Sequence, residues 1–211
     1  MRNEIAGAPR GVPTRVQRSR RRLPAAALLV LAAAACSATP SVEDDRVLVV
    51  GDSLVNGTAS AITQGLTNEG WQPVVDGRPG WSIGRWASGL APVADLARAR
   101  VAVVVLGTND CAPECRDVDQ GITRILHTLT EAGVERVLWL NVQEDADYPD
   151  HPDEVNGRLA LAAARWPQLS IVDLSSALGG RPELHSDRVH FNEAGGLALT
   201  ELVLDQLDRT R

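Results

Sequence analysis

A serine, an asparagine and an aspartate–histidine pair are the residues of this chain whose types and positions could support chemistry. Ser53 lies in the sequence Gly51-Asp52-Ser53-Leu54, between an apolar run and a stretch with helical spacing. A serine at the start of a helix is close to free backbone N–H groups and to the positive end of the helix dipole, which stabilise negative charge on a neighbouring oxygen. Serine is also a favoured N-cap residue, so Ser53 alone does not distinguish a nucleophile from a helix cap.

The candidate base for this serine is His190, which follows Asp187 in the sequence Asp-Arg-Val-His. A histidine whose ring is oriented by a carboxylate can remove a proton from a serine hydroxyl and return it to a leaving group. The spacing lets Asp187 and His190 meet through one turn of a loop. An isolated Asp-x-x-His is more often a surface ion pair, so this motif gains its meaning only from the others.

Asn109 is the third candidate, and it follows Gly107 at the end of another apolar run. An asparagine side chain can donate a hydrogen bond to a developing oxyanion. By itself, an asparagine after a strand is usually a turn former or a helix cap.

The candidate residues must be positioned by secondary structure, and short apolar runs alternate along the chain with longer segments of helical spacing. Runs rich in β-branched residues predict strands over 47–50, 74–75, 101–106, 134–142 and 169–174. Helical spacing predicts helices over 54–69, 83–98, 118–132, 153–165 and 192–207. Because runs such as 101–106 are apolar at every position, they indicate a parallel sheet covered on both faces. The pattern predicts an α/β fold: a three-layer α/β/α sandwich with a doubly wound, parallel, five-stranded sheet, whose active site lies beyond the carboxyl ends of the strands.

The combination of motifs is far more specific than its parts. Gly-Asp-Ser-Leu near the start, Gly-Thr-Asn-Asp in the middle and Asp-x-x-His near the end resemble, in order and context, the motifs of SGNH/GDSL hydrolases over about residues 46–208. The resemblance implies a flavodoxin-like fold and a serine esterase or lipase mechanism. In that mechanism Ser53 is the nucleophile, His190 is the general base and acid, and Asp187 orients the imidazole.

The same resemblance implies an oxyanion hole with three donors. These are the N–H of Ser53, the side chain of Asn109 and the N–H of a glycine after the second predicted strand. Gly77 and Gly80 are both candidates for the last position. We prefer Gly80, because it immediately precedes the predicted helix.

These residues predict a carboxylic ester hydrolase that needs no metal or organic cofactor. The expected substrates are acetyl or short acyl esters of polysaccharides or lipids. Transfer of an acetyl group to a sugar hydroxyl is an alternative, because residues 75–83 resemble the corresponding block in SGNH domains of polysaccharide O-acetyltransferases. A non-catalytic glycan-binding lipoprotein is a third alternative, although the intact Ser53, Asn109, Asp187 and His190 argue against it.

The N-terminal 35 residues have the composition of an export signal. Arginines crowd residues 15–22, an apolar segment follows over 23–35, and Cys36 comes directly after small residues. The apolar segment is shorter than the roughly 20 residues that a membrane-spanning helix needs. Cys36 resembles the lipidated cysteine of a bacterial lipoprotein box, and residues 19–23 are similar to a twin-arginine signal, so general and folded-state export both remain open.

We therefore divide the chain into a signal peptide (1–35), a tether (36–45) and a hydrolase domain (46–211). The expected location is extracytoplasmic, either anchored to the cell membrane through a lipid or secreted. Without the signal peptide the chain carries 14 basic and 26 acidic residues, a formal net charge of −12. This charge argues against nucleic acid or an anionic lipid surface as a partner.

Cysteine usage agrees with an oxidising compartment. With Cys36 lipidated, Cys111 and Cys115 are left to form a disulfide with each other. The alternative, half of a metal site, is weak because no second pair of cysteines or histidines lies nearby.

The remaining histidines and two tryptophans have less specific interpretations. His185 is expected at the rim of the site, His127 in a structural or exposed helix position, and His151 in a solvated acidic loop. Trp81 and Trp86 could line a substrate groove, but core packing explains them equally well.

Overall fold

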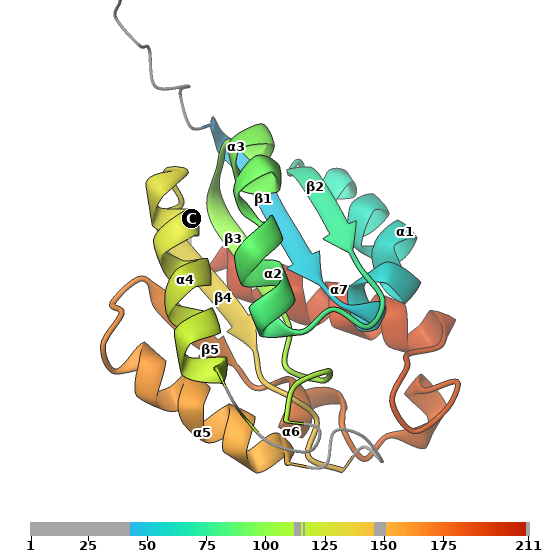
Figure 1. Cartoon of the computed structure of the whole chain (residues 1–211). Coiled ribbons are helices and arrows are strands. Elements are labelled where there is room, and N and C mark those ends of the chain that lie inside the picture. Colours follow the sequence, from blue (N-terminus) through green and yellow to red (C-terminus); the bar gives the residue numbers. More distant parts are fainter. Residues whose placement is uncertain (1–42, 112–114, 116, 146–150, 210–211) are drawn as a thin grey trace, which may run out of the picture. The chain divides into compact units, whose positions relative to one another are not determined.

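A computed structural model of the chain describes residues 43–111, 115, 117–145 and 151–209 (Figure 1). The predicted signal peptide, Cys36 and most of the predicted tether lie outside these residues. None of the helices in the described ranges is long and apolar enough to cross a bilayer.

The centre of the fold is one sheet of five strands. They are β1 (Glu43–Gly51), β2 (Gln72–Gly77), β3 (Ala99–Val105), β4 (Arg136–Leu140) and β5 (Leu169–Val172). The strand order is β2-β1-β3-β4-β5 and every neighbouring pair is parallel. This is the doubly wound, flavodoxin-like order, so the predicted fold class is confirmed. The first strand begins at Glu43, earlier than the domain boundary we expected at Arg46.

Helices follow the strands as expected, except that one predicted helix is divided in two and that a short helix and a 3₁₀ turn after β5 are additional to the prediction. The structure has α1 (Ser53–Asn68), α2 (Ile83–Gly89), α3 (Ala91–Ala97), α4 (Val118–Glu131), α5 (Pro152–Ala163), α6 (Leu174–Leu178), a 3₁₀ turn η1 (Pro182–Leu184) and α7 (Glu193–Asp208). The single helix predicted over 83–98 is wrong, because the chain breaks at Leu90 into α2 and α3. Pro92 explains the break: it has no N–H to donate, and its ring would clash with the carbonyl one turn earlier in a continuous helix.

Helices cover both faces of the sheet, with α2, α3 and α4 on one side and α1 and α7 on the other (Figure 1). Neighbouring residues of β1 enter different halves of the core. Val47 and Val49 pack with residues of α1 and α7, whereas Leu48 and Val50 pack with residues of α2 and α4. All four side chains are buried, which explains why the strand is apolar at every position.

The register of the sheet places three strand ends in line. Gly51, the last residue of β1, is opposite Gly77 of β2 on one side and Val105 of β3 on the other. The segments that follow these strands and contain Ser53, Gly80 and Asn109 therefore leave the same edge of the sheet. This edge flanks β1, where the order of the strands reverses, and such a switch point is where doubly wound folds bind ligands.

Candidate active site

Ser53, His190 and Asp187 form one hydrogen-bonded chain. The Ser53 Oγ lies 3.0 Å from the His190 Nε2, and the His190 Nδ1 lies 2.8 Å from the Asp187 Oδ2. Ser53 comes from the N-terminus of α1, whereas the other two residues come from the loop before α7; Ser53 and His190 are 137 positions apart in the chain. The carboxylate fixes the ring with Nε2 facing the serine hydroxyl, which is the arrangement that lets a histidine accept the hydroxyl proton.

Asp187 is held by the backbone of its own loop. Its Oδ1 accepts hydrogen bonds from the N–H groups of His190 at 2.6 Å and of Val189 at 2.7 Å. The His190 N–H, followed by the His190 ring and the Val189 N–H, holds the pKa of the Asp187 carboxyl well below its usual range. The carboxylate therefore stays ionised and can stabilise a positive charge on the imidazole.

At the start of α1, the residue that caps the helix is not the candidate nucleophile. Asp52 is the N-cap of the helix, and its Oδ1 accepts the N–H of Leu54 at 2.9 Å. Ser53 is the first helical residue, so the alternative that it serves as the cap is wrong. In the part of the chain that the structure describes, the N–H of Ser53 donates to no acceptor.

Asn109 and Gly80 lie beside each other at the same edge. The Asn109 Nδ2 donates to the Asp52 Oδ2 at 3.0 Å and makes a longer contact of 3.4 Å with the carbonyl oxygen of Trp81, the residue after Gly80. Gly80 has a φ of 72°, with open space where a Cβ would stand. Its N–H, like that of Ser53, has no acceptor among the described residues.

Gly77, the other candidate, has a packing role. A Cβ on Gly77 would collide with the backbone nitrogen of Asn56 in α1. Its carbonyl oxygen also accepts a hydrogen bond from the Asn56 side chain at 3.3 Å. Gly77 thus lets β2 pass close to α1, whereas Gly80 shapes the loop beside Asn109.

Two buried tryptophans hold the ends of the strands that lead into the site. The indole N–H of Trp86 donates to the carbonyl oxygen of Gly51 at 3.0 Å, and that of Trp139 donates to the carbonyl oxygen of Leu106 at 3.1 Å. Both rings are fully buried, so Trp86 is a core residue and not part of a groove. Trp81 is half-buried, with the guanidinium groups of Arg78 and Arg85 4.4 and 4.6 Å from its ring centre.

Two buried carboxyl groups lie beneath the site. Burial, together with nearby Asp110, raises the pKa of Asp52 to about 6 against the opposing effects of the Leu54 N–H, Asn109 and His190. Burial also raises the pKa of Asp110 to about 6. The Asp110 carboxylate accepts the N–H of Ile83 at 3.0 and 3.2 Å, which ties the start of α2, and the loop before it, to the end of β3.

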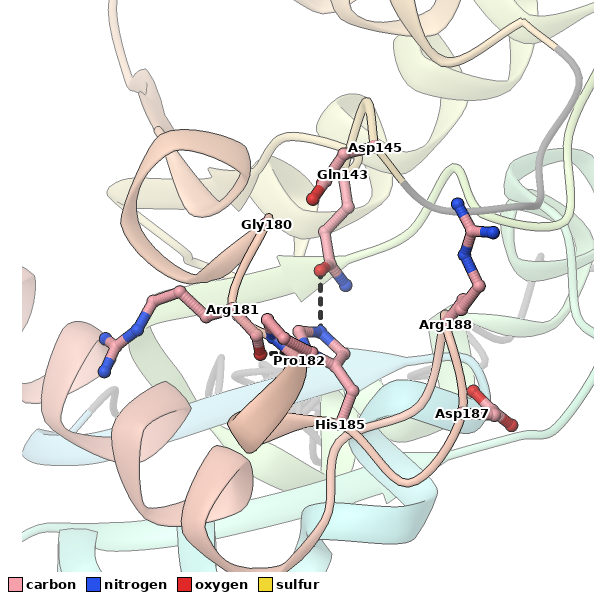
Figure 2. A pocket seen from close by; sticks show the side chains of 8 residues that line it. All are labelled: Gln143, Asp145, Gly180, Arg181, Pro182, His185, Asp187 and Arg188. Carbon is pink, nitrogen blue, oxygen red and sulfur yellow. Dashed lines mark hydrogen bonds between the residues drawn. The ribbon is translucent and has the colours of Figure 1, made fainter.

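A polar pocket of about 170 Å³ borders the Asp187 loop (Figure 2). On one of its walls, His185 bonds to the Gln143 Oε1 and to the carbonyl oxygen of Arg181, at 2.9 Å each. The His185 ring also packs against Phe191, with 4.9 Å between ring centres. His185 is thus a pocket-wall residue, and it connects the Asp187 loop to the buried Gln143 after β4.

The other cysteines and histidines that the structure describes lie outside this site. Cys111 and Cys115 form a disulfide, as predicted. His127 packs edge-on against Trp166, and His151 precedes the first residue of α5. The described residues contain no cluster of three or more histidines, cysteines or acidic residues that could hold a metal ion.

Sequence reasoning missed the residues that support the site. Asp52 does carry a local signal, because an aspartate directly before a helix is a favoured cap. The partners of Asp110, Trp139 and Gln143 could not be found from the sequence, because they are distant in the chain. A buried tryptophan N–H or carboxylate needs a partner, but the sequence does not say which one.

Comparison with known proteins agrees with this geometry. A model of the GDSL-like lipase/acylhydrolase family matches residues 49–196. No curated protein sequence matches the chain.

Several solved structures share the fold. A putative acylhydrolase from Bacteroides fragilis has a TM-score of 0.64 at 18% identity, over 82% of this chain and 92% of that one. A carbohydrate esterase family 3 protein from Talaromyces cellulolyticus has a TM-score of 0.63 at 18% identity, over 78% and 96%. The catalytic domain of peptidoglycan O-acetyltransferase A from Streptococcus pneumoniae has a TM-score of 0.61 at 17% identity, over 79% and 94%. Because the family model covers most of the chain, including the segments that contain Ser53, Asn109 and His190, this protein belongs to the GDSL-like lipase/acylhydrolase family of hydrolases.

Proposed function

We propose that the protein is a serine esterase that cleaves acetyl or other short acyl esters through an acyl-enzyme formed on Ser53. The observation that carries this proposal is the chain of hydrogen bonds from the Ser53 Oγ through His190 to Asp187. A hydroxyl in this position can lose its proton to the imidazole while it attacks a carbonyl carbon.

The steps follow from the positions of the donors and acceptors. The Ser53 Oγ forms a bond to the ester carbon as its proton moves to the His190 Nε2. The tetrahedral oxyanion is held by the N–H groups of Ser53 and Gly80 and by the Asn109 amide. The C–O bond to the alcohol then breaks, and the alcohol leaves with the proton from His190. Water attacks the acyl-enzyme by the same route in reverse and releases the acid.

The long contact between Asn109 and Trp81 fits this role. One Asn109 N–H is engaged by Asp52 at 3.0 Å, while the other only approaches the Trp81 carbonyl at 3.4 Å. A hydrogen bond to an oxyanion is shorter and stronger than one to a neutral carbonyl, so a tetrahedral intermediate would displace the weaker partner.

The site suits an ester with a polar alcohol group. The side chains of His190 and Asp187 are 45% and 56% exposed, so the triad lies at the surface. The pocket next to it presents Gln143, Asp145 and Arg181, which are hydrogen-bonding groups. These features, together with the fold shared with a carbohydrate esterase, support acetylated polysaccharides as substrates over long-chain lipids.

The test compares hydrolysis of p-nitrophenyl acetate by Ser53→Ala and His190→Ala with that by Ser60→Ala and His127→Ala. We expect the first two variants to lose at least about 10³-fold in kcat and the control variants to retain full activity. Undiminished hydrolysis by Ser53→Ala or His190→Ala would reject the proposed mechanism. A profile over C2 to C8 esters then tests acyl length, and a preference for C8 would count against a short-chain esterase.

Acetyl transfer to a sugar is the second candidate function, supported by the fold shared with a peptidoglycan O-acetyltransferase domain. In that reaction a sugar hydroxyl replaces water in the second step. Acetate release and acetyl-glycan formation would be measured with and without a glycan acceptor. Glycan acetylation at the expense of acetate would favour the transferase, and unchanged acetate release would favour the esterase.

The proposed location is outside the cytoplasm, with Cys36 as the lipidated residue that anchors the mature chain. The support is the order of basic, apolar and small residues before Cys36 in the sequence. Incorporation of labelled palmitate in a bacterial host should occur in the full chain and be absent from Cys36→Ser. Equal labelling of both proteins would contradict the anchor.

A further inference from the structure

Asp52 is an ionisable side chain with no exposed surface, directly before the proposed nucleophile. Both of its oxygens accept hydrogen bonds: Oδ1 from the N–H of Leu54 at 2.9 Å and Oδ2 from the Asn109 Nδ2 at 3.0 Å. The carboxylate therefore joins the start of α1, where Ser53 lies, to the end of β3, where Asn109 lies. These two ends are 57 positions apart in the chain.

We propose that Asp52 is a positioning residue that selects which end of the Asn109 amide faces the oxyanion. This inference rests on the proposed function, because it assigns Asn109 the role of an oxyanion donor.

The Asp52 carboxylate and the Asn109 amide differ in the hydrogen bonds that they can form. An asparagine amide can turn over, and it presents an oxygen in one orientation and an NH₂ group in the other. Only the NH₂ group stabilises an oxyanion, whereas the oxygen would repel it. An ionised carboxylate only accepts hydrogen bonds, so Asp52 binds the nitrogen of Asn109 and excludes the reverse orientation. The second hydrogen on the same nitrogen is then directed away from Asp52, on the side of the Trp81 carbonyl.

The charged groups near Asp52 are consistent with an ionised acceptor at neutral pH. Burial and the neighbouring Asp110 raise the pKa of Asp52 to about 6, while the Leu54 N–H, Asn109 and His190 oppose the increase. At pH 7 the carboxyl group is thus mostly ionised and acts as an acceptor for both bonds.

Asp52→Asn makes the two tasks of the side chain incompatible. An asparagine has a single acceptor oxygen. If that oxygen caps Leu54, its NH₂ group faces the Asn109 NH₂ group, and Asn109 must turn over. Asp52→Ser keeps the cap on α1 but loses the contact with Asn109, because a serine caps a helix well but is too short to reach that amide.

A second aspartate in this chain supplies the matched control. Asp173 is the N-cap of α6, and its Oδ1 accepts both the Ser176 N–H at 3.0 Å and the Asn141 Nδ2 at 2.9 Å. It thus joins the ends of β4 and β5 as Asp52 joins those of β1 and β3, but it has no part in the triad. Asp173→Asn and Asp173→Ser should leave kcat unchanged.

The experiment measures kcat and KM for p-nitrophenyl acetate at pH 7.5 in Asp52→Asn, Asp52→Ser, Asn109→Ala and the double variant Asp52→Asn/Asn109→Ala. Loss of one oxyanion donor costs about 10²- to 10³-fold in kcat. We expect Asn109→Ala to lose that much, both Asp52 variants to lose more than tenfold in kcat with KM little changed, and the double variant to lose no more than Asn109→Ala alone. A cycle of this kind measures coupling between residues in contact.

The outcomes separate the two levels of the proposal. If Asn109→Ala keeps full activity, the oxyanion role of Asn109 fails, and the positioning role falls with it. If Asn109→Ala is impaired while Asp52→Ser is fully active, or if the losses multiply in the double variant, positioning by Asp52 is rejected and the esterase proposal stands. Circular dichroism and thermal melting confirm that each variant is folded, and Asp52→Ser, which keeps the cap, provides the result should Asp52→Asn misfold.

Discussion

The indole N–H of Trp86 donates to the carbonyl oxygen of Gly51 at 3.0 Å, across 35 positions of the chain. Gly51 is the last residue of β1 and stands directly before Asp52 and Ser53, while Trp86 lies in α2, which follows the Gly80 loop in the chain. One buried hydrogen bond thus connects the strand before the proposed nucleophile to the helix that follows Gly80, a proposed oxyanion donor.

Replacing Trp86 with Phe should weaken both stability and catalysis. The ring is kept in part, and the Gly51 carbonyl loses one of two donors, because it also accepts the Arg78 N–H at 2.9 Å. Loss of this one hydrogen bond costs about 0.5–1.5 kcal/mol in free energy of unfolding. Urea denaturation measures this loss, and kcat for p-nitrophenyl acetate should fall in parallel as the two loops loosen. Trp166→Phe is the control, because the Trp166 ring packs against His127 and its described contacts do not involve these loops. Equal effects in the two variants would argue against a specific role for the Trp86 bond.

Replacing Asp187 with Asn should lower kcat by about 10³- to 10⁴-fold, as expected when the carboxylate of a triad is lost. The oxygen of the new amide can still accept the N–H groups of Val189 and His190. Its NH₂ group would then donate to the His190 Nδ1, which leaves the proton on Nε2, where Ser53 needs an acceptor. Steady-state kinetics would be compared with Asp205→Asn, which alters an exposed carboxylate of α7 outside the pocket and should retain activity. Activity close to wild type in Asp187→Asn would show that the carboxylate is not needed.

Alanine substitutions at Gly80 and Gly77 should have different effects. Gly80→Ala forces an alanine into a left-handed conformation, which costs about 1–2 kcal/mol, but open space surrounds the new methyl group. We expect this variant to fold and to lose at least about tenfold in kcat as its N–H shifts. Gly77→Ala should mainly lower the melting temperature, because β2 and α1 must move apart. If Gly77→Ala is stable but inactive and Gly80→Ala is fully active, the assignment of the oxyanion glycine must be reversed.

The buried Asp110 should make the protein less stable as pH rises. Its pKa rises from 3.8 to about 6 on folding because the group is buried. Between about pH 4 and pH 6 the folded protein keeps a proton that the unfolded chain releases, so this group lowers stability as pH rises through that window. Asp110→Asn removes the effect and can still accept the Ile83 N–H.

The free energy of unfolding of Asp110→Asn, relative to wild type, should therefore increase by up to about 3 kcal/mol between pH 4 and pH 7. Urea titrations at several pH values measure this difference. Asp187 has the opposite sign at lower pH because its pKa is lowered, but both proteins contain it and its contribution cancels. A difference that stays constant across the window would contradict the raised pKa.

Reduction of the Cys111–Cys115 disulfide should destabilise the protein only modestly. The two cysteines are four positions apart, and a loop this short contributes about 2 kcal/mol in the chain-entropy description. Thermal melting with and without dithiothreitol measures the change, with the Cys111→Ser/Cys115→Ser variant as a control that should not respond to the reductant. Complete unfolding on reduction would mean that the disulfide has a larger role than loop closure.

The sequence alone determined the fold class and the three residues that form the triad. Strands such as β3 are apolar at every position because both faces of a parallel sheet are covered, so their type could be recognised without knowing their neighbours. The triad residues Ser53, Asp187 and His190, like Asn109, could be found because each lies in a short motif at the end of a predicted strand or before a predicted helix. One local conflict was misjudged: helical spacing suggested one helix over 83–98, but Pro92 divides it into two.

Only the tertiary structure decided how the site is supported. The contacts of Asp52 with Asn109, of Asp110 with Ile83 and of Trp86 with Gly51 join residues 27 to 57 positions apart, and each depends on strand order and register. It also decided that Asp52, and not Ser53, caps α1, and that Gly77 packs against α1 while Gly80 adopts a positive φ beside Asn109. Residue types show which groups need a hydrogen-bonding partner when they are buried, but the partner is chosen by the packing of elements that are distant in the chain.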